Sequence, residues 1–77
     1  MWIEAEKALE EARELRTNTD PGTILILRER VDRFLSKNLV AIEEYRSKMP
    51  GIVDPFLRET LKELIDQYDE VQKCAPE

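Results

Sequence analysis

Apolar residues recur at spacings of three and four along three stretches of this chain, which is the periodicity of an amphipathic helix. The first stretch has a stripe made largely of alanine, and the last has the cleanest stripe of the three. The stripes consist of Ala5, Ala8, Ala12 and Leu15, with Trp2 and Leu9 beside them, and of Leu57, Leu61, Leu64, Tyr68 and Val71, with Ile65 beside them. Because alanine has little bulk, we expect the first helix to approach its neighbour closely.

The middle stretch, residues 23–49, is the longest periodic run and carries more apolar residues than one helix face needs. Its core stripe is Ile24, Leu27, Val31, Phe34, Leu35, Ala41, Ile42, Tyr45 and Met49. Leu25, Ile26 and Val40 fall away from that stripe at 100° per residue, and Leu39 lies at its border. Residues 24–27 also fit a short buried strand, but the chain offers no second strand to pair with it, so a helix is favoured.

Proline and glycine mark the helix ends. Asp20 and Asp54 each precede a proline, a start signal in which the aspartate caps free amides and proline takes the first helical position. Met49 precedes Pro50, and the residue before a proline is pushed out of the α region. We therefore predict helices over about residues 2–16, 21–49 and 55–73. The expected fold class is all-α, a single domain of residues 1–77 built as a three-helix up-down-up bundle with a long central helix.

Charge differs between the three predicted helices. The first and the third each have five acids and three bases, which gives −2, whereas the middle one has six bases and four acids, which gives +2. A basic helix between two acidic ones favours their adjacency in a bundle. The net charge of −5 disfavours a nucleic-acid partner.

Membrane and secretory signals are not found in the sequence. No apolar run approaches the roughly 20 residues that a membrane span needs, and the first residues begin no signal peptide. Cys74 is the only cysteine, so no intrachain disulfide is available. We expect a soluble, cytoplasmic protein with no membrane partner.

The predicted helices also differ in length. At 1.5 Å per residue the middle helix spans roughly 39 Å, against roughly 22 Å and 28 Å for the other two. The shorter helices cannot cover it fully, and an overhang that carries leucine and isoleucine is ordinarily buried by another copy or by a protein partner. We therefore predict an interface at Leu25, Ile26, Leu39 and Val40.

Asn38 falls on the core stripe of the middle helix, and two interpretations remain open. A buried asparagine at such a position fixes register and oligomeric state at a cost in stability. Alternatively, the stripe drifts around the helix and leaves Asn38 half exposed.

Residues that carry chemistry are scarce. The chain has no histidine, one cysteine, and two glycines in separate turns. This removes the commonest base, a thiolate zinc site and a glycine-rich phosphate loop. The carboxylates fall mostly on predicted solvent faces, so we expect no metal site, no cofactor and no catalytic residue.

The predicted function is a small, non-enzymatic protein–protein interaction module that forms homodimers through its central helix. A purely structural role, as part of a larger assembly or as an engineered bundle, stays open, and two alternatives with a specific activity remain. The first is a small acidic inhibitor of the antitoxin or immunity type that masks a basic partner. The second is a helical enzyme that binds an anionic small molecule through Arg28 and Arg46, with Arg30 and Arg33 completing a basic groove.

Overall fold

The computed structural model describes residues 2–75, and these form the three predicted helices without a strand. Their bounds are α1 (Ile3–Thr17), α2 (Pro21–Lys48) and α3 (Pro55–Cys74), with a short 3₁₀ turn, η1 (Met49–Gly51), after α2. Each end lies within one residue of its predicted position. Met1, Pro76 and Glu77, which the predicted domain includes, lie outside the described residues. The all-α, three-helix bundle is confirmed, and residues 24–27 are helical.

The two Asp-Pro helix starts differ in how they are capped. Asp54 accepts a hydrogen bond from the backbone N–H of Phe56 at 3.0 Å, as predicted. Asp20 makes no such side-chain cap, and its carboxylate accepts instead from the Thr23 hydroxyl at 2.6 Å. That hydrogen bond, followed by the nearby backbone N–H of Thr23, lowers the pKa of Asp20 below its ordinary value. The predicted hydrogen-bonded amide cap at Asp20 is therefore not formed, although its carboxylate lies near the backbone N–H of Thr23 and the helix does begin there.

The core forms where all three helices meet. Three alanines of α1 are buried, so α1 lies close to its neighbours as predicted. The buried residues are Ala5, Ala8, Ala12, Leu15, Leu27, Val31, Phe34, Ile42, Ile65, Tyr68 and Val71.

An aromatic series crosses this core. Trp2 is half-buried, and its ring packs on Phe34 at a centroid distance of 5.2 Å. Phe34 in turn packs on Tyr68 at 6.1 Å. The Tyr68 hydroxyl donates to the Leu35 carbonyl at 2.8 Å, which joins α3 to α2 through a buried side chain. Trp2 thus closes the edge of the core rather than filling its centre, as its polar N–H favours.

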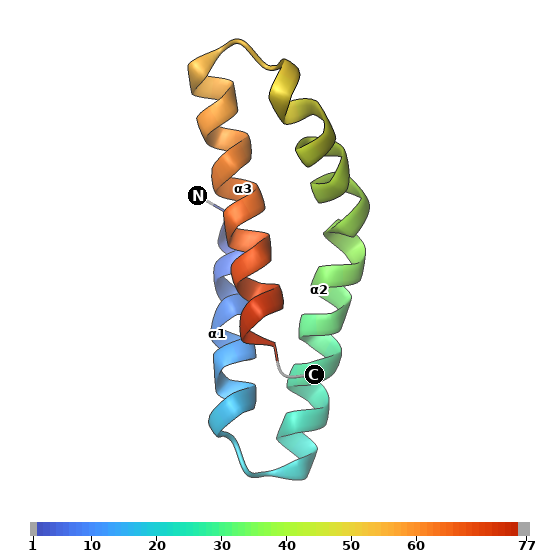
Figure 1. Cartoon of the computed structure of the whole chain (residues 1–77). Helices are drawn as coiled ribbons and strands as arrows, with labels where there is room; N and C mark the ends of the chain where they lie inside the picture. The colour runs from blue at the N-terminus through green and yellow to red at the C-terminus, as the bar shows by residue number, and fades with distance from the viewer. Residues whose placement is uncertain (1, 76–77) are drawn as a thin grey trace.

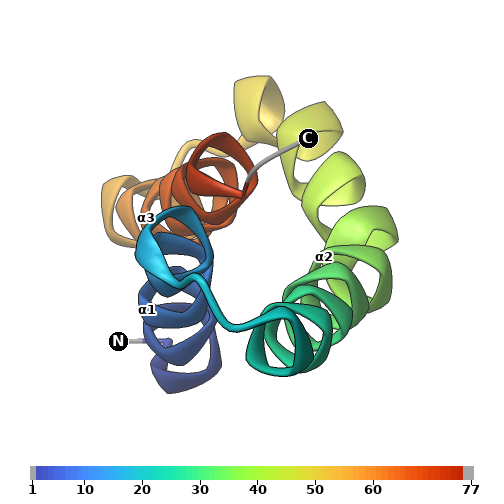
Figure 2. The same ribbon diagram turned by 90° about the horizontal axis from the view of Figure 1, so that it is seen from below.

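The helices are staggered along an elongated molecule of 47 × 19 × 17 Å. They stand at the corners of a triangle when viewed end-on (Figure 2). In Figure 1, α1 lies beside the lower part of α2 only, and the α2–α3 turn forms the upper end. The overhang predicted for the central helix is present, and it leaves the upper end with two helices instead of three.

Ion pairs join the basic central helix to both acidic neighbours. Arg30 pairs with Glu11 and Lys37 pairs with Glu4, each at 3.2 Å, between α2 and α1. Arg46 pairs with an aspartate of α3, Asp69. All of these side chains except that of Glu11 are at least two-fifths exposed, so each pair adds only about 1 kcal/mol. Together the pairs agree with the predicted order of charges.

Candidate interaction surface

The four residues of the predicted interface all lie on the side of α2 that faces solvent. Leu25 is 70% exposed, Ile26 57%, Leu39 42% and Val40 73%. We call these four residues the α2 outer face. Two members are separated from the other two by 14 positions, which is about 21 Å along the helix axis. All four predicted residues are exposed in the structure, but they form two separate pairs rather than one patch.

The stretch between the two pairs is polar. The groove beside it is lined by Leu25, Arg28, Glu29, Asp32, Arg33 and Ser36. Arg33 and Glu29 form an ion pair there at 2.8 Å. A partner that covered both pairs at once would also have to cover these charges, which carries a desolvation cost.

A second apolar surface lies at the upper end of the molecule. We call residues 41–63, which include the end of α2, η1 and the start of α3, the hairpin end. Val53 is 92% exposed, Phe56 80% and Leu57 46%. Leu57 was expected in the core stripe, and its exposure is a correction to that expectation. The physical reason is that α1 does not extend to this level, so the apolar side of α3 has no third helix beside it (Figure 1).

Val53 and Phe56 were not singled out from the sequence. Val53 precedes the capping Asp54 in the loop, and Phe56 falls outside the stripe of α3, so neither fits a helical period. The sequence did contain one indication of this surface, because four large apolar residues flank the second Asp-Pro helix start. They are Ile52, Val53, Phe56 and Leu57.

A cavity marks the level at which α1 begins. We call it the hairpin groove. Its volume is about 260 Å³, and Trp2 lies at one side of it. The lining residues are Trp2, Asn38, Ala41, Ile42, Tyr45 and Leu64. Most of this lining is apolar.

Two amide side chains near the core differ in their hydrogen bonding. Asn38 is half-buried, as the second interpretation of it expected, and its Nδ2 donates to the Phe34 carbonyl at 2.9 Å. It is thus paired within its own helix. Gln67 differs, because its buried Oε1 has no hydrogen-bond partner among the residues described.

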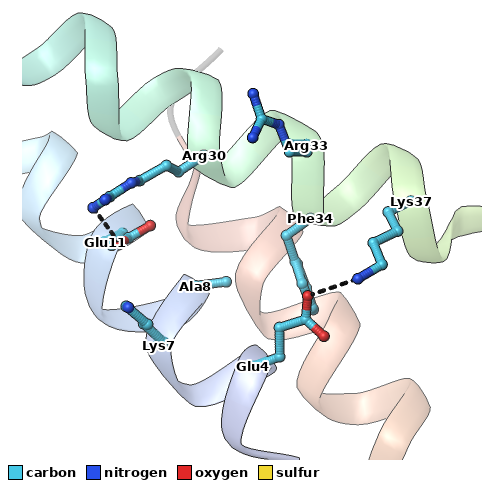
Figure 3. Close-up of a pocket in the computed structure, with 8 residues that line it drawn as sticks. All are labelled: Glu4, Lys7, Ala8, Glu11, Arg30, Arg33, Phe34 and Lys37. Carbon is cyan, nitrogen blue, oxygen red and sulfur yellow. Dashed lines mark hydrogen bonds and ion pairs between the residues drawn. The ribbon is translucent and has the colours of Figure 1, made fainter.

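A further pocket lies between α1 and α2 and contains several bases (Figure 3). It is lined by Glu4, Lys7, Ala8, Glu11, Arg30, Arg33, Phe34 and Lys37. Arg30 and Lys37 each contact a carboxylate of α1, whereas Arg33 points away from α1 (Figure 3). The cations of this pocket are thus largely engaged with carboxylates of the same protein.

The four arginines of the alternative basic groove do not converge. Arg30 and Arg33 line the pocket of Figure 3, and Arg28 and Arg33 border the outer groove of α2, but Arg28 and Arg30 share neither site. Arg46 pairs with Asp69 and lies 18 positions from Arg28, about 27 Å along the axis. An anionic small molecule held by Arg28 and Arg46 together would have to span that distance.

Residues suited to metal or thiol chemistry form no cluster in the part of the chain that the structure describes. Cys74 is a free, half-buried thiol at the end of α3, with its Sγ 3.9 Å from the Glu70 carboxylate. Within residues 2–75, no helix has both the length and the apolar character to cross a membrane. No protein-family model, curated protein or solved structure matches the chain.

Proposed function

We propose that this chain is a small, non-enzymatic protein–protein interaction module that forms homodimers through apolar surface on its central helix and the adjoining hairpin. One observation carries the proposal: eight large apolar side chains are exposed on a bundle of this size. They are Ile3, Leu25, Ile26, Leu39, Val40, Val53, Phe56 and Leu57. Grouped exposure of this kind marks surfaces that proteins bury on association.

The size of the chain supports association. A domain of 77 residues has a core that is only marginally sufficient for stability. Here three of the buried core residues are alanines, which contribute little apolar area. Contact with a second copy would remove further apolar surface from water and add to the free energy of unfolding. A reducing, cytoplasmic setting belongs to the same proposal, because Cys74 is the only cysteine.

Sedimentation velocity over a concentration series tests the proposal. We expect the weight-average sedimentation coefficient to rise with concentration from the monomer value toward the dimer value. A coefficient that stays at the monomer value up to about 1 mM, which is the limit of weak specific association, would refute homodimerisation.

Two surfaces are available for the contact, the α2 outer face and the hairpin end. The double variant Ile26→Glu/Val40→Glu places charge on the first surface alone. Both side chains are exposed, so the substitutions leave the core intact. The predicted interface at Leu25, Ile26, Leu39 and Val40 requires that this variant dissociate without unfolding.

A further inference from the structure

The α2 outer face lies opposite the buried side of α2. The buried residues of this helix, which pack in the core with α1 and α3, are Leu27, Val31, Phe34 and Ile42. At about 100° per residue, the centre of the α2 outer face is roughly half a turn away from the centre of that buried stripe. The three helices stand at the corners of a triangle in Figure 2, so α1 and α3 both lie behind this face. A partner can therefore approach the face without meeting either of them.

Two apolar edges border the α2 outer face. Leu25 and Leu39 are 14 positions apart, about 40° short of four full turns, so they lie on one edge, which we call the first edge. Ile26 and Val40 have the same spacing and lie on the other edge, which we call the second edge. All four side chains are exposed. Each edge thus has one exposed apolar side chain at either end of the face.

The charged residues between the apolar pairs follow the same two edges. Arg28 and Asp32 lie on the first edge, whereas Glu29 and Arg33 lie toward the second. All four line the outer groove of α2, whose lining residues belong to α2 alone. Two acids and two bases cancel, so a partner with charges of a single sign would be repelled by half of them. A partner that fits must present both signs in a matching order.

A residue of the first edge is followed directly in the chain by a residue of the second edge that complements it. The neighbours are both apolar at the two ends of the face and opposite in charge in the middle. They are Leu25 with Ile26, Arg28 with Glu29, Asp32 with Arg33, and Leu39 with Val40. In two parallel helices related by a two-fold axis, the first edge of one copy lies against the second edge of the other. Two copies of this chain would therefore match at all four levels.

We propose that two copies dimerise in parallel and in register through the α2 outer face, about a two-fold axis that runs along the two α2 helices. Each of these residues of the first edge then contacts the residue that is next in number on the second copy, within about 1.5 Å of the same level. This inference rests on the proposed homodimerisation and gives it a surface and a direction. A two-fold contact is isologous, so every pair forms twice.

Opposite charges across the contact offset the cost of covering them. Arg28 of one copy lies against Glu29 of the other, and Asp32 lies against Arg33. Within each copy, Glu29 already pairs with Arg33 at 2.8 Å. Arg28, Glu29, Arg33 and Asp32 thus form one series of alternating sign across the contact. A charge that gains a partner when it leaves water is far less costly than one that does not.

An antiparallel contact through the same face fits less well. In that direction each edge lies against the same edge of the second copy, with the axis between residues 32 and 33. The apolar pairs would still meet, because Leu25 would lie beside Leu39 of the second copy. At the centre, however, Asp32 would meet its own counterpart, and so would Arg33. Like charges therefore oppose the antiparallel direction.

Two acids limit the contact at its upper end. Glu43 and Glu44 follow Leu39 and Val40 by about one turn, and a parallel pair would place these like charges together there. We therefore confine the contact to residues 25–40, about 24 Å along one helix of each copy. A contact of this length is short for a specific interface. We expect a reversible dimer with a Kd in the micromolar range or weaker.

A charge reversal and a charge exchange test the register, with Kd measured by sedimentation velocity and folding by circular dichroism. Asp32→Arg places a base against Arg33 of the second copy, so it should weaken the dimer at least about fivefold. Asp32→Arg/Arg33→Asp exchanges the two charges between the edges, so it should bind at least about threefold more tightly than Asp32→Arg. Asp66→Arg, at an exposed position of α3, changes the net charge equally and should not weaken the dimer. Equal loss from Asp66→Arg, or no recovery on exchange, would overturn the register.

A matched pair of variants tests the location. Ile26→Glu/Val40→Glu should dissociate the dimer, and Val53→Glu/Phe56→Glu, which adds the same charge at exposed positions of the hairpin end, should change Kd less than about threefold. A wild-type protein that remains monomeric at all concentrations removes both this inference and the proposed function. A wild-type dimer that only Val53→Glu/Phe56→Glu dissociates, or that both variants weaken equally, overturns this contact and leaves homodimerisation standing.

A cysteine at the centre of the face reports the direction. Ser36 is exposed and lies between the two edges, so its two copies face each other in the parallel contact. In a Cys74→Ser background, Ser36→Cys should form a disulfide-linked dimer on mild oxidation. Asp32→Cys should not, because its two copies lie on opposite sides of the parallel contact. An antiparallel contact gives the reverse, so equal cross-linking of the two variants, or preferential cross-linking of Asp32→Cys, would overturn the parallel direction.

Discussion

Tyr68 joins α3 to α2 through one buried hydrogen bond, and Tyr68→Phe isolates that bond. The hydroxyl donates to the Leu35 carbonyl at 2.8 Å, while the ring packs on Phe34. Phenylalanine keeps the ring and removes only the donor, so no large cavity is left. We expect the free energy of unfolding at pH 7 to fall by about 1 kcal/mol. In a domain of this length that lowers Tm by roughly 4–8 °C.

The effect of Tyr68→Phe on stability should also depend on pH in the alkaline range. Burial, followed by the nearby charges of Glu43 and Asp69, raises the pKa of Tyr68 above its ordinary value, and Arg46 opposes this. The folded protein thus holds the phenolic proton more tightly than the unfolded chain does. Stability from the neutral hydroxyl is fully present below the unfolded pKa of about 10 and is lost as the pH rises through the folded value. Tyr68→Phe has no such proton, so the difference in the free energy of unfolding between the wild type and the variant should narrow above a pH of about 10.

Urea unfolding of both proteins, followed by far-ultraviolet circular dichroism at pH 7 and in steps up to about pH 11, measures this difference. All other titrating groups are common to the two proteins, so the difference in free energy reports Tyr68 alone. Low protein concentration keeps any dimer out of the comparison. A difference in the free energy of unfolding that is absent at pH 7, or that stays constant or widens as the pH rises, would refute the assigned role of the hydroxyl.

Smaller substitutions probe the rest of the structure, each read by urea unfolding. Ile42→Val, at a buried position, should cost about 1 kcal/mol, whereas Val40→Ala on the exposed side should cost less than about 0.5 kcal/mol; similar costs would contradict the burial assigned to α2. Asp54→Ala should cost about 1 kcal/mol because it removes an amide cap, and Asp20→Ala should cost less; the reverse order would count against the cap assignment. Gln67→Met removes a buried acceptor that has no partner, so it should stabilise the protein by up to about 1 kcal/mol, and a clear loss of stability would contradict that.

Local chemistry made the helices predictable from the sequence. Periodic stripes identified the core faces, as with Val31 and Val71, and the two Asp-Pro pairs located the helix starts. These signals depend on residues within one or two turns of each other. The helix bounds therefore agree with the prediction to within one residue.

Features that depend on how the helices are staggered were predictable only in part. The length difference indicated an overhang, and the four residues of the α2 outer face are exposed as expected. The position of that overhang was not predictable, because helical period gives no register between helices. Leu57 has a core pattern but lies beyond the reach of α1, and Asp20 has a capping pattern but turns to Thr23. Asn38 is half-buried, and its side chain donates a hydrogen bond to the Phe34 carbonyl of its own helix.

The short α1 helix connects stability to the proposed function. Its alanines let it pack closely on the lower part of α2, where it completes a core around Phe34. Because α1 begins only at Ile3, Ile42 and Tyr45 lie at the border between the three-helix and two-helix parts. The proposed dimer would bury apolar side chains that the three helices leave exposed, so its stabilising effect should depend on protein concentration.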